Sequence, residues 1–127
     1  MLYIYNMSNL TPQNVRNASS EQQDRVFRAL ASHHRRAILD ALRDQPLTTG
    51  AICAQFPELD RCTVMQHLKV LEAADLILVD RRGRERWNYL NPLPIHAIHE
   101  RWIGPHAEQA VALLSRLKMD LETQSIH

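Results

Sequence analysis

The sequence predicts a mainly α-helical fold with one small β-hairpin, in the element order ααααββα. Apolar residues recur at intervals of three and four between residues 19 and 74, which is the spacing of amphipathic helices. The segment "LILVDRRGRERWNYL" (residues 76–90) then places β-branched and aromatic residues on both sides of a glycine. That pattern is typical of two strands joined by a tight turn.

Length and composition indicate an ordinary globular chain. It has 127 residues, of which 45% are hydrophobic and 23% are charged, enough for one domain with a modest core. The formal net charge of +1 points to no class of partner, so a nucleic-acid interaction has to be argued from local charge. Two cysteines are too few for a disulfide framework. No basic residue precedes Arg16, and the apolar runs are short, so we expect a cytoplasmic protein.

The N-terminal third predicts a tail followed by two helices. Residues 1–18 show no sustained apolar period, and we expect them to form a flexible tail or a short arm that becomes ordered only on a partner. The first helix should begin at Ser19, with a common apolar face formed by Val26, Phe27 and Leu30. The second helix should use Ser32 as its N-cap, and its inward residues should be Ile38, Leu39 and Leu42.

Two further helices follow. The chain restarts after Pro46 with Thr48 or Thr49 as the cap, and the buried residues of this third helix should be Ile52, Cys53 and Phe56. Asp60 can cap the fourth helix, whose core positions are Val64, Leu68 and Leu71. Together with the hairpin, these helices define a domain at residues 19–94, and residues 95–127 form a C-terminal helical segment with a kink or break at Gly104-Pro105.

The fourth helix carries reaching polar side chains opposite its core face. A helix-turn-helix places such a helix in the DNA major groove, and the residues available to read bases are Arg61, Thr63, Gln66 and His67. Cys62 lies at the helix start beside these residues. The phosphate backbone would be held by Thr48, Thr49 and Lys69. The alternative is a plain solvated helix face.

The hairpin turn is basic. Residues 81–86 read "RRGRER", and an exposed arginine-rich ribbon beside a helix-turn-helix resembles a wing that inserts into the minor groove. The arginines concerned are Arg81, Arg82, Arg84 and Arg86. The alternative is that these charges only protect an edge ribbon from aggregation. Helix and wing together favour binding to double-stranded DNA.

Three segments, "ALASHHRRAILDAL", "TVMQHLKVLEAADLI" and "RRGRERWNYLNP", resemble the ArsR-type winged helix-turn-helix transcriptional repressors over about residues 25–95. The likeness is closest to the branch that lacks the Cys-x-Cys metal box, since the third helix carries Cys53 alone. The resemblance implies a homodimer on an inverted-repeat operator, with the first and last helices at the dimer interface. In this sequence that interface would comprise Val26 and Phe27 of the first helix.

The last helix supports a dimer independently. Its apolar seam consists of Ile95, Ile98, Trp102, Ala110, Leu114, Leu117 and Leu121; the alternative is that it packs only on its own domain. His96, His99 and His106 share one side of this helix and are weak candidates for a metal site. We expect that the protein holds neither a metal nor a cofactor. Cys62, at a helix N-terminus, is either a reactive thiol or a residue that simply makes contact.

Catalysis is disfavoured by the sequence. The chain has three glycines and no phosphate-cradling loop, and no arrangement of nucleophile and base is apparent. The remaining alternative to DNA binding is a winged helix that serves as a protein-protein interaction module. The absence of Asp and Glu between Arg61 and Val70 favours a surface that faces phosphates. A DNA-binding regulator is therefore the function that the sequence predicts.

Overall fold

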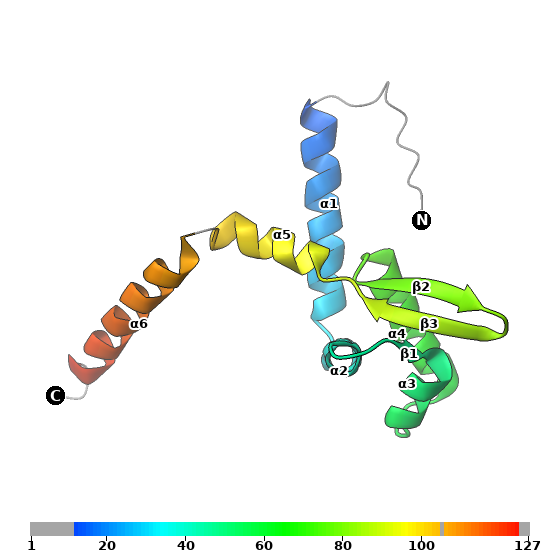
Figure 1. Cartoon of the computed structure of the whole chain (residues 1–127). Helices are drawn as coiled ribbons and strands as arrows, with labels where there is room; N and C mark the ends of the chain where they lie inside the picture. The colour runs from blue at the N-terminus through cyan, green and yellow to red at the C-terminus, as the bar shows by residue number, and fades with distance from the viewer. Residues whose placement is uncertain (1–11, 105, 125–127) are drawn as a thin grey trace. The chain divides into compact units, whose positions relative to one another are not determined.

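The computed structural model describes residues 12–104 and 106–124 (Figure 1). Its elements in chain order are α1 (Pro12–Leu30), α2 (His33–Leu42), β1 (Leu47–Thr48), α3 (Thr49–Gln55), α4 (Arg61–Ala73), β2 (Ile77–Arg82), β3 (Glu85–Leu90), α5 (Leu93–Trp102) and α6 (Ala107–Gln124). The predicted order of four helices, a hairpin and a helical C-terminus is confirmed. The structure adds a short strand, β1, and divides the last helix in two.

The first helix begins earlier than the sequence predicted. It starts at Pro12, whereas we expected Ser19, so residues 12–18 are helical and their assignment to a tail is wrong. Proline suits the first turn of a helix because its missing N–H has no intrahelical acceptor there. The remainder of the predicted tail, residues 1–11, lies outside the described residues.

The core forms where α1, α2 and α4 pack together. Its fully buried side chains include Val26, Ile38, Ile52, Leu68, Leu71, Leu76 and Ile77, and the predicted inward faces of α2 and α4 are confirmed. Cys53 and Phe56 are only half-buried, so their prediction as core residues is wrong. Helix α3 is short and ends at Gln55, and it turns only Thr49 and Ile52 fully inward.

Side chains cap the three helices that build this unit. Ser32 Oγ accepts from the backbone N–H of Arg35 at 3.4 Å, Thr48 Oγ1 from Ala51 at 3.1 Å, and Asp60 Oδ1 from Thr63 at 2.7 Å. Each bond satisfies an otherwise unpaired donor of the first helical turn. The structure thus selects Thr48 over Thr49 as the cap of α3.

The sheet is antiparallel, with strand order β1-β3-β2. Strands β2 and β3 pair from Ile77↔Leu90 to Arg82↔Glu85, and β1 adds Leu47↔Asn88. Gly83 closes the hairpin with φ +62°, a backbone conformation that glycine adopts without steric cost. Strand β1 was not predicted from the sequence because two residues are too few to show an alternating pattern.

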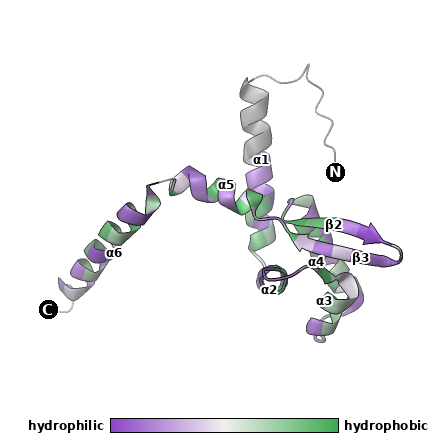
Figure 2. Cartoon of the chain, viewed as in Figure 1, coloured by the Kyte–Doolittle hydropathy of each residue, from purple (hydrophilic) through white to green (hydrophobic). Residues whose placement is uncertain are grey.

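The described residues fall into two compact units, the first ending at Ile95 and the second beginning at His96. Gly104, with φ +67°, ends the helical run that α5 begins, so the predicted break is confirmed. In the second unit α6 has no buried residue, and hydrophobic and hydrophilic residues alternate along it (Figure 2). Among the described helices, none combines the length and apolar character needed to cross a membrane.

Candidate DNA-binding surface

Helix α4 presents a polar face to solvent. Val64, Leu68 and Leu71 are fully buried, and the exposed residues on the other side are Arg61, Cys62, Gln66 and Lys69. Thr63 is half-buried. Side chains three and four apart share one face of a helix, so Cys62, Gln66 and Lys69 form one line. Arg61 begins the helix beside Asp60, whose carboxylate is already engaged by the helix N-terminus.

The hydrogen bonds from Thr63 to Asp60 hold the pKa of this carboxyl below its ordinary value. The charged form is the better acceptor for a backbone N–H at a helix N-terminus. Asp60 therefore stays ionised while it fixes the first turn of α4.

Two adjoining hollows run between α4 and the hairpin. The first is lined by the start of α3 (Thr48, Thr49 and Gly50), by Arg61 and Met65 of α4, and by the hairpin residues Arg84, Glu85 and Arg86. The second is lined by Met65, Gln66, Lys69, Glu72 and Arg86. The fold therefore brings the start of α3, the polar face of α4 and the hairpin to one side of the unit, as the predicted DNA-binding surface requires.

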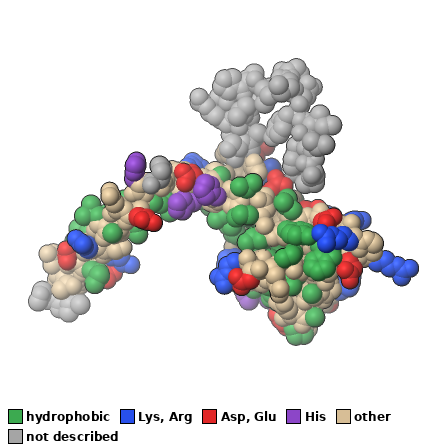
Figure 3. All heavy atoms as spheres, viewed as in Figure 1, with side chains coloured by type: hydrophobic (Ala, Val, Ile, Leu, Met, Phe, Trp, Pro, Cys, Tyr) green, Lys and Arg blue, Asp and Glu red, His purple; other side chains and the backbone are tan. Residues whose placement is uncertain are grey.

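The four hairpin arginines are not equivalent. Arg81 and Arg84 are exposed and form no ion pair with any residue in the described part of the chain. Basic side chains lie at the free end of the hairpin (Figure 3). Arg82 is exposed and donates to Asp80 at 2.9 Å and to the Tyr89 hydroxyl at 3.1 Å. The bond to Asp80 is the main reason that the pKa of Arg82 is raised.

Arg86 was predicted to be a wing cation, and the structure corrects this. Its side chain is only 22% exposed and its Nη2 donates to Glu72 Oε2 on α4. The sequence could not reveal this pairing because Glu72 and Arg86 lie on separate elements. Arg86 thus connects the hairpin to α4, whereas Arg81 and Arg84 remain available to an anion.

Thr49 was predicted to hold a phosphate, but it is 4% exposed. Its hydroxyl donates to the carbonyl of Arg86 at 3.5 Å and accepts from Asn88 Nδ2 at 3.1 Å. Because its one O–H group already donates to this carbonyl, the buried hydroxyl has no donor left for a phosphate oxygen. Thr48 is half-buried and caps α3. The sequence did not predict a role for Asn88, a buried polar residue that joins β3 to the start of α3 through its bond to Thr49.

His67 was predicted to read bases, and its surroundings differ from those of Gln66. It is half-buried, with its Nδ1 3.4 Å from Nη1 of Arg35 and its ring centroid 5.7 Å from that of His34. Burial, followed by the positive charges of Arg35 and His34, lowers the pKa of His67. This histidine therefore lies against α2 as a neutral side chain and is separated from the line formed by Cys62, Gln66 and Lys69.

Two arginines in the first turn of α2 have a structural role that the sequence did not predict. Arg35 Nε donates to the carbonyl of Ala29 at 2.7 Å, and Arg36 Nη1 donates to that of Leu30 at 2.6 Å. Carbonyls at a helix C-terminus lack intrahelical donors, and cations there are favoured by the helix dipole. The histidine pair at the start of α2 thus precedes two arginines that cap α1.

The predicted dimer residues differ in their exposure. Val26 is 1% exposed within the single chain, so it belongs to the core and its assignment to a dimer interface is wrong. Ile98 is half-buried. The others are exposed: Phe27, Ile95, Trp102, Ala110, Leu114, Leu117 and Leu121.

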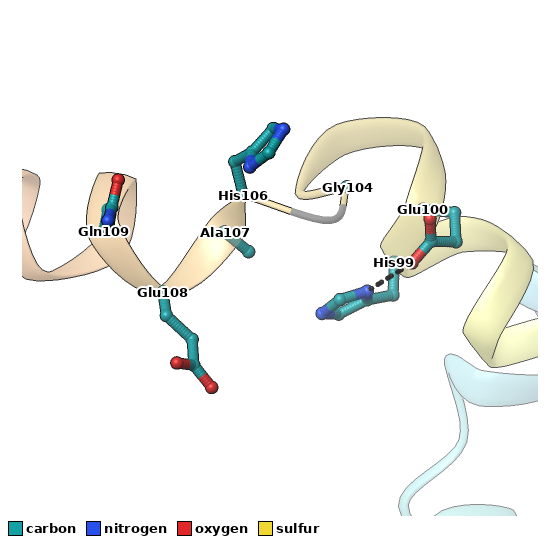
Figure 4. Close-up of a pocket in the computed structure, with 7 residues that line it drawn as sticks. All are labelled: His99, Glu100, Gly104, His106, Ala107, Glu108 and Gln109. Atoms are coloured by element: carbon teal, nitrogen blue, oxygen red, sulfur yellow. Dashed lines mark ion pairs between the residues drawn. The ribbon is translucent and has the colours of Figure 1, made fainter.

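The candidate metal ligands lie in the second unit. His99, Glu100, His106 and Glu108 line a hollow with Gly104, Ala107 and Gln109, and His106 points away from His99 and Glu100 (Figure 4). His96 and His99 both approach Glu100, at 3.7 and 3.5 Å. Within residues 12–104 and 106–124, no group of three His, Cys, Asp or Glu side chains is close enough to hold a metal ion. Both thiols are free, with Cys62 exposed.

Comparison with known proteins gives a consistent result. Residues 26–80 match the model of a helix-turn-helix domain family. The chain is 39% identical over 75 residues to the HTH-type transcriptional regulator Rv2034 of Mycobacterium tuberculosis, covering 59% of this chain and 69% of that protein. It is 33% identical over 66 residues to the transcriptional repressor SdpR of Bacillus subtilis, covering 52% and 72%. The crystal structure of the ArsR family transcriptional regulator RHA00566 superposes with a TM-score of 0.61 and 31% identity, covering 76% and 94%.

Proposed function

We propose that this chain, which belongs to the ArsR family of winged helix-turn-helix transcriptional regulators, represses transcription as a homodimer on an inverted-repeat DNA operator. DNA-binding regulation is the activity of the family, and the similar protein SdpR is named a transcriptional repressor. The observation that carries the proposal is the acid-free stretch of α4 from Arg61 to Val70, with Gln66 and Lys69 exposed, beside two exposed arginines of the hairpin. We call α4 the recognition helix and the β2–β3 hairpin the wing.

The recognition helix is proposed to enter the major groove, which is about 12 Å wide and admits one α-helix. Gln66 projects from its exposed face and is suited to pair with adenine, while Arg61 is suited to guanine. Thr63 and Cys62 lie at the same end of the helix and contact neighbouring bases or sugars. Lys69 binds a phosphate further along the groove.

The wing is proposed to reach the minor groove. Arg81 and Arg84 are exposed and form no ion pair within residues 12–104 and 106–124, and the narrow minor groove concentrates negative potential. Arg82 shares its charge with Asp80 and contributes less. In this arrangement α4 reads the bases, and the wing tip contacts the phosphate backbone or the minor groove.

The homodimer is proposed to form through the apolar side chains of the first and last helices. Phe27, Trp102 and Leu114 are 42%, 61% and 60% exposed in the single chain, and large exposed apolar surfaces mark protein interfaces. A two-fold dimer would present two recognition helices about one turn of DNA apart, roughly 34 Å. In this proposal the protein is cytoplasmic and has no catalytic role.

The first experiment is a fluorescence anisotropy titration of the full chain against the DNA upstream of its own gene, with a scrambled duplex of equal length. We expect a dissociation constant of about 10⁻⁸ M or below for the former and at least 10³-fold weaker binding to the latter. The affinity should fall steeply with salt. Equal, weak binding to both duplexes would reject this operator, and no binding at low salt would favour a protein-protein interaction module.

Repression is tested separately from binding. A reporter gene under the same upstream DNA should be silenced when the chain is expressed and released when Gln66→Ala replaces it. A rise in reporter activity on expression would identify an activator and reject the repressor assignment, while leaving the DNA-binding proposal intact.

A further inference from the structure

We infer that Glu72 is a positioning residue for DNA recognition: it holds Arg86 as a strut between the recognition helix and the wing and keeps this arginine from the DNA phosphates. The inference rests on the DNA binding proposed above. It assigns to Arg86 a role different from that of Arg81 and Arg84, although all three come from one arginine-rich segment.

The contact between the two side chains is close and partly shielded from water. Arg86 Nη2 donates to Glu72 Oε2, and the side chains are 22% and 33% exposed. By comparison, the pair between Arg82 and Asp80 has side chains that are 63% and 52% exposed. A partly desolvated, charge-assisted hydrogen bond is stronger than an exposed pair. Glu72 therefore holds the guanidinium of Arg86 firmly against α4.

The backbone of Arg86 is fixed at the same place. Its carbonyl accepts from Thr49 Oγ1 at 3.5 Å and from Asn88 Nδ2 at 3.3 Å. Asn88 Nδ2 also lies 3.2 Å from the carbonyl of Leu47. Strand β3 is thus tied to β1 and to the start of α3 through the main chain of Arg86, while the side chain reaches α4. Arg86 thus joins the wing both to the start of α3 and to the recognition helix.

Cross-strand neighbours give the pair a second role. Arg86 lies directly opposite Arg81 in the β2–β3 ladder, and side chains at paired positions point to the same face of the sheet. Two adjacent guanidinium groups repel each other. The carboxylate of Glu72 offsets the charge of Arg86, which reduces the repulsion between Arg86 and Arg81.

The position of the carboxylate explains why the pair should not bind phosphate. Glu72 and Arg86 line a common hollow with Gln66 and Lys69, on the side that is proposed to face DNA. An unpaired carboxylate there would repel the phosphate backbone of DNA, whereas the ion pair has no net charge. A neutral pair releases no counterions from DNA, so it should add affinity only by fixing the wing.

The salt dependence of binding separates a strut from a phosphate contact. Glu72→Gln/Arg86→Gln removes the pair without leaving a lone charge, and Arg84→Gln is the matched control. Titrations use the full chain and its upstream DNA. A lost phosphate contact lowers the slope of log K against log salt by about 0.9. We expect that loss for Arg84→Gln, while the double variant keeps the wild-type slope and binds the operator about tenfold more weakly.

The single variant Glu72→Gln tests the restraint directly. It releases Arg86, so the slope should steepen by up to about 0.9 and the scrambled duplex should bind more tightly. The inference is overturned if the double variant loses slope as Arg84→Gln does, because Arg86 would then contact phosphate. It is overturned equally if the double variant keeps full operator affinity.

A measurement without DNA tests the strut even if the proposed function fails. Amide hydrogen exchange of the wing should be about tenfold faster in Glu72→Gln and in Arg86→Gln than in the wild type. The swapped variant Glu72→Arg/Arg86→Glu should restore protection, and circular dichroism confirms that each variant folds. Unchanged wing exchange in both single variants would reject the strut. Loss of DNA binding in the wild-type chain alone would reject only the proposed function.

Discussion

Asp75 offers a quantitative test of how the recognition helix is joined to the wing. It follows α4 with φ +58°, in the left-handed region that disfavours side chains. The backbone N–H of Leu76 donates to the carbonyl of Leu71, and that of Asp75 to the carbonyl of Glu72, both at 3.0 Å. This is the Schellman arrangement, in which the left-handed position is usually glycine.

The comparison of Asp75→Gly with Asp75→Ala isolates the backbone contribution. Both variants lose the carboxylate and its 3.5 Å bond from Gln22, so that loss cancels between them. A Cβ in the left-handed region costs about 1–2 kcal/mol, and the greater freedom of glycine in the unfolded chain offsets about 0.4–1 kcal/mol. The glycine variant should therefore be more stable than the alanine variant by about 1 kcal/mol.

Urea unfolding followed by circular dichroism measures this difference, with chain concentration held constant because a dimer would be stabilised by mass action. In thermal unfolding, about 1 kcal/mol corresponds to a midpoint difference of roughly 4–8 °C for a unit of this size. Equal stability of the two variants would show that the left-handed backbone carries no strain. The explanation of this helix end would then be incorrect.

Three further predictions follow from the site. Gln66→Ala should relax the preference at one base pair by about 1–3 kcal/mol, whereas Lys69→Ala should weaken all duplexes and lower the salt slope by about 0.9; titrations against single-base operator variants distinguish them. The folded-state pKa of His67 is depressed, so its stabilising contribution is full above about pH 6.5 and is lost as pH falls. His67→Gln should reduce that acid-side loss in urea unfolding. Leu117→Glu should give a monomer in sedimentation equilibrium, and a persistent dimer would place the interface elsewhere.

Local patterns were sufficient for the helices and their caps. The apolar faces of α2 and α4 follow from residues three and four apart, because a helix brings such residues to one side. Ser32 and Asp60 were recognised as caps because short polar side chains satisfy the first helical N–H groups. The start of α1 was misplaced because residues 12–18 show no sustained apolar period, and helix propensity alone is a weak signal.

The candidate site was predicted only in outline. The acid-free stretch from Arg61 to Val70 and the basic turn predict a DNA-binding surface, since charge and residue type are visible in the sequence. The structure corrects the predicted roles of Thr49 and Arg86, and it places His67 in a half-buried position, because burial and partners depend on contacts between distant elements. Each of these side chains is polar enough to meet DNA, and only its packing removes it from the exposed face.

The sequence by itself determined the helices, the hairpin, the basic turn and the family resemblance, because periodicity, capping and local charge act over a few residues. Only the tertiary structure decided which arginines of the hairpin are available to bind an anion such as a DNA phosphate. Arg84 is exposed at the turn, whereas Arg86 of β3 forms an ion pair with Glu72 of helix α4. The availability of a charged side chain depends on its neighbours, and those of Arg86 result from the packing of β3 against α3 and of β2 against α4.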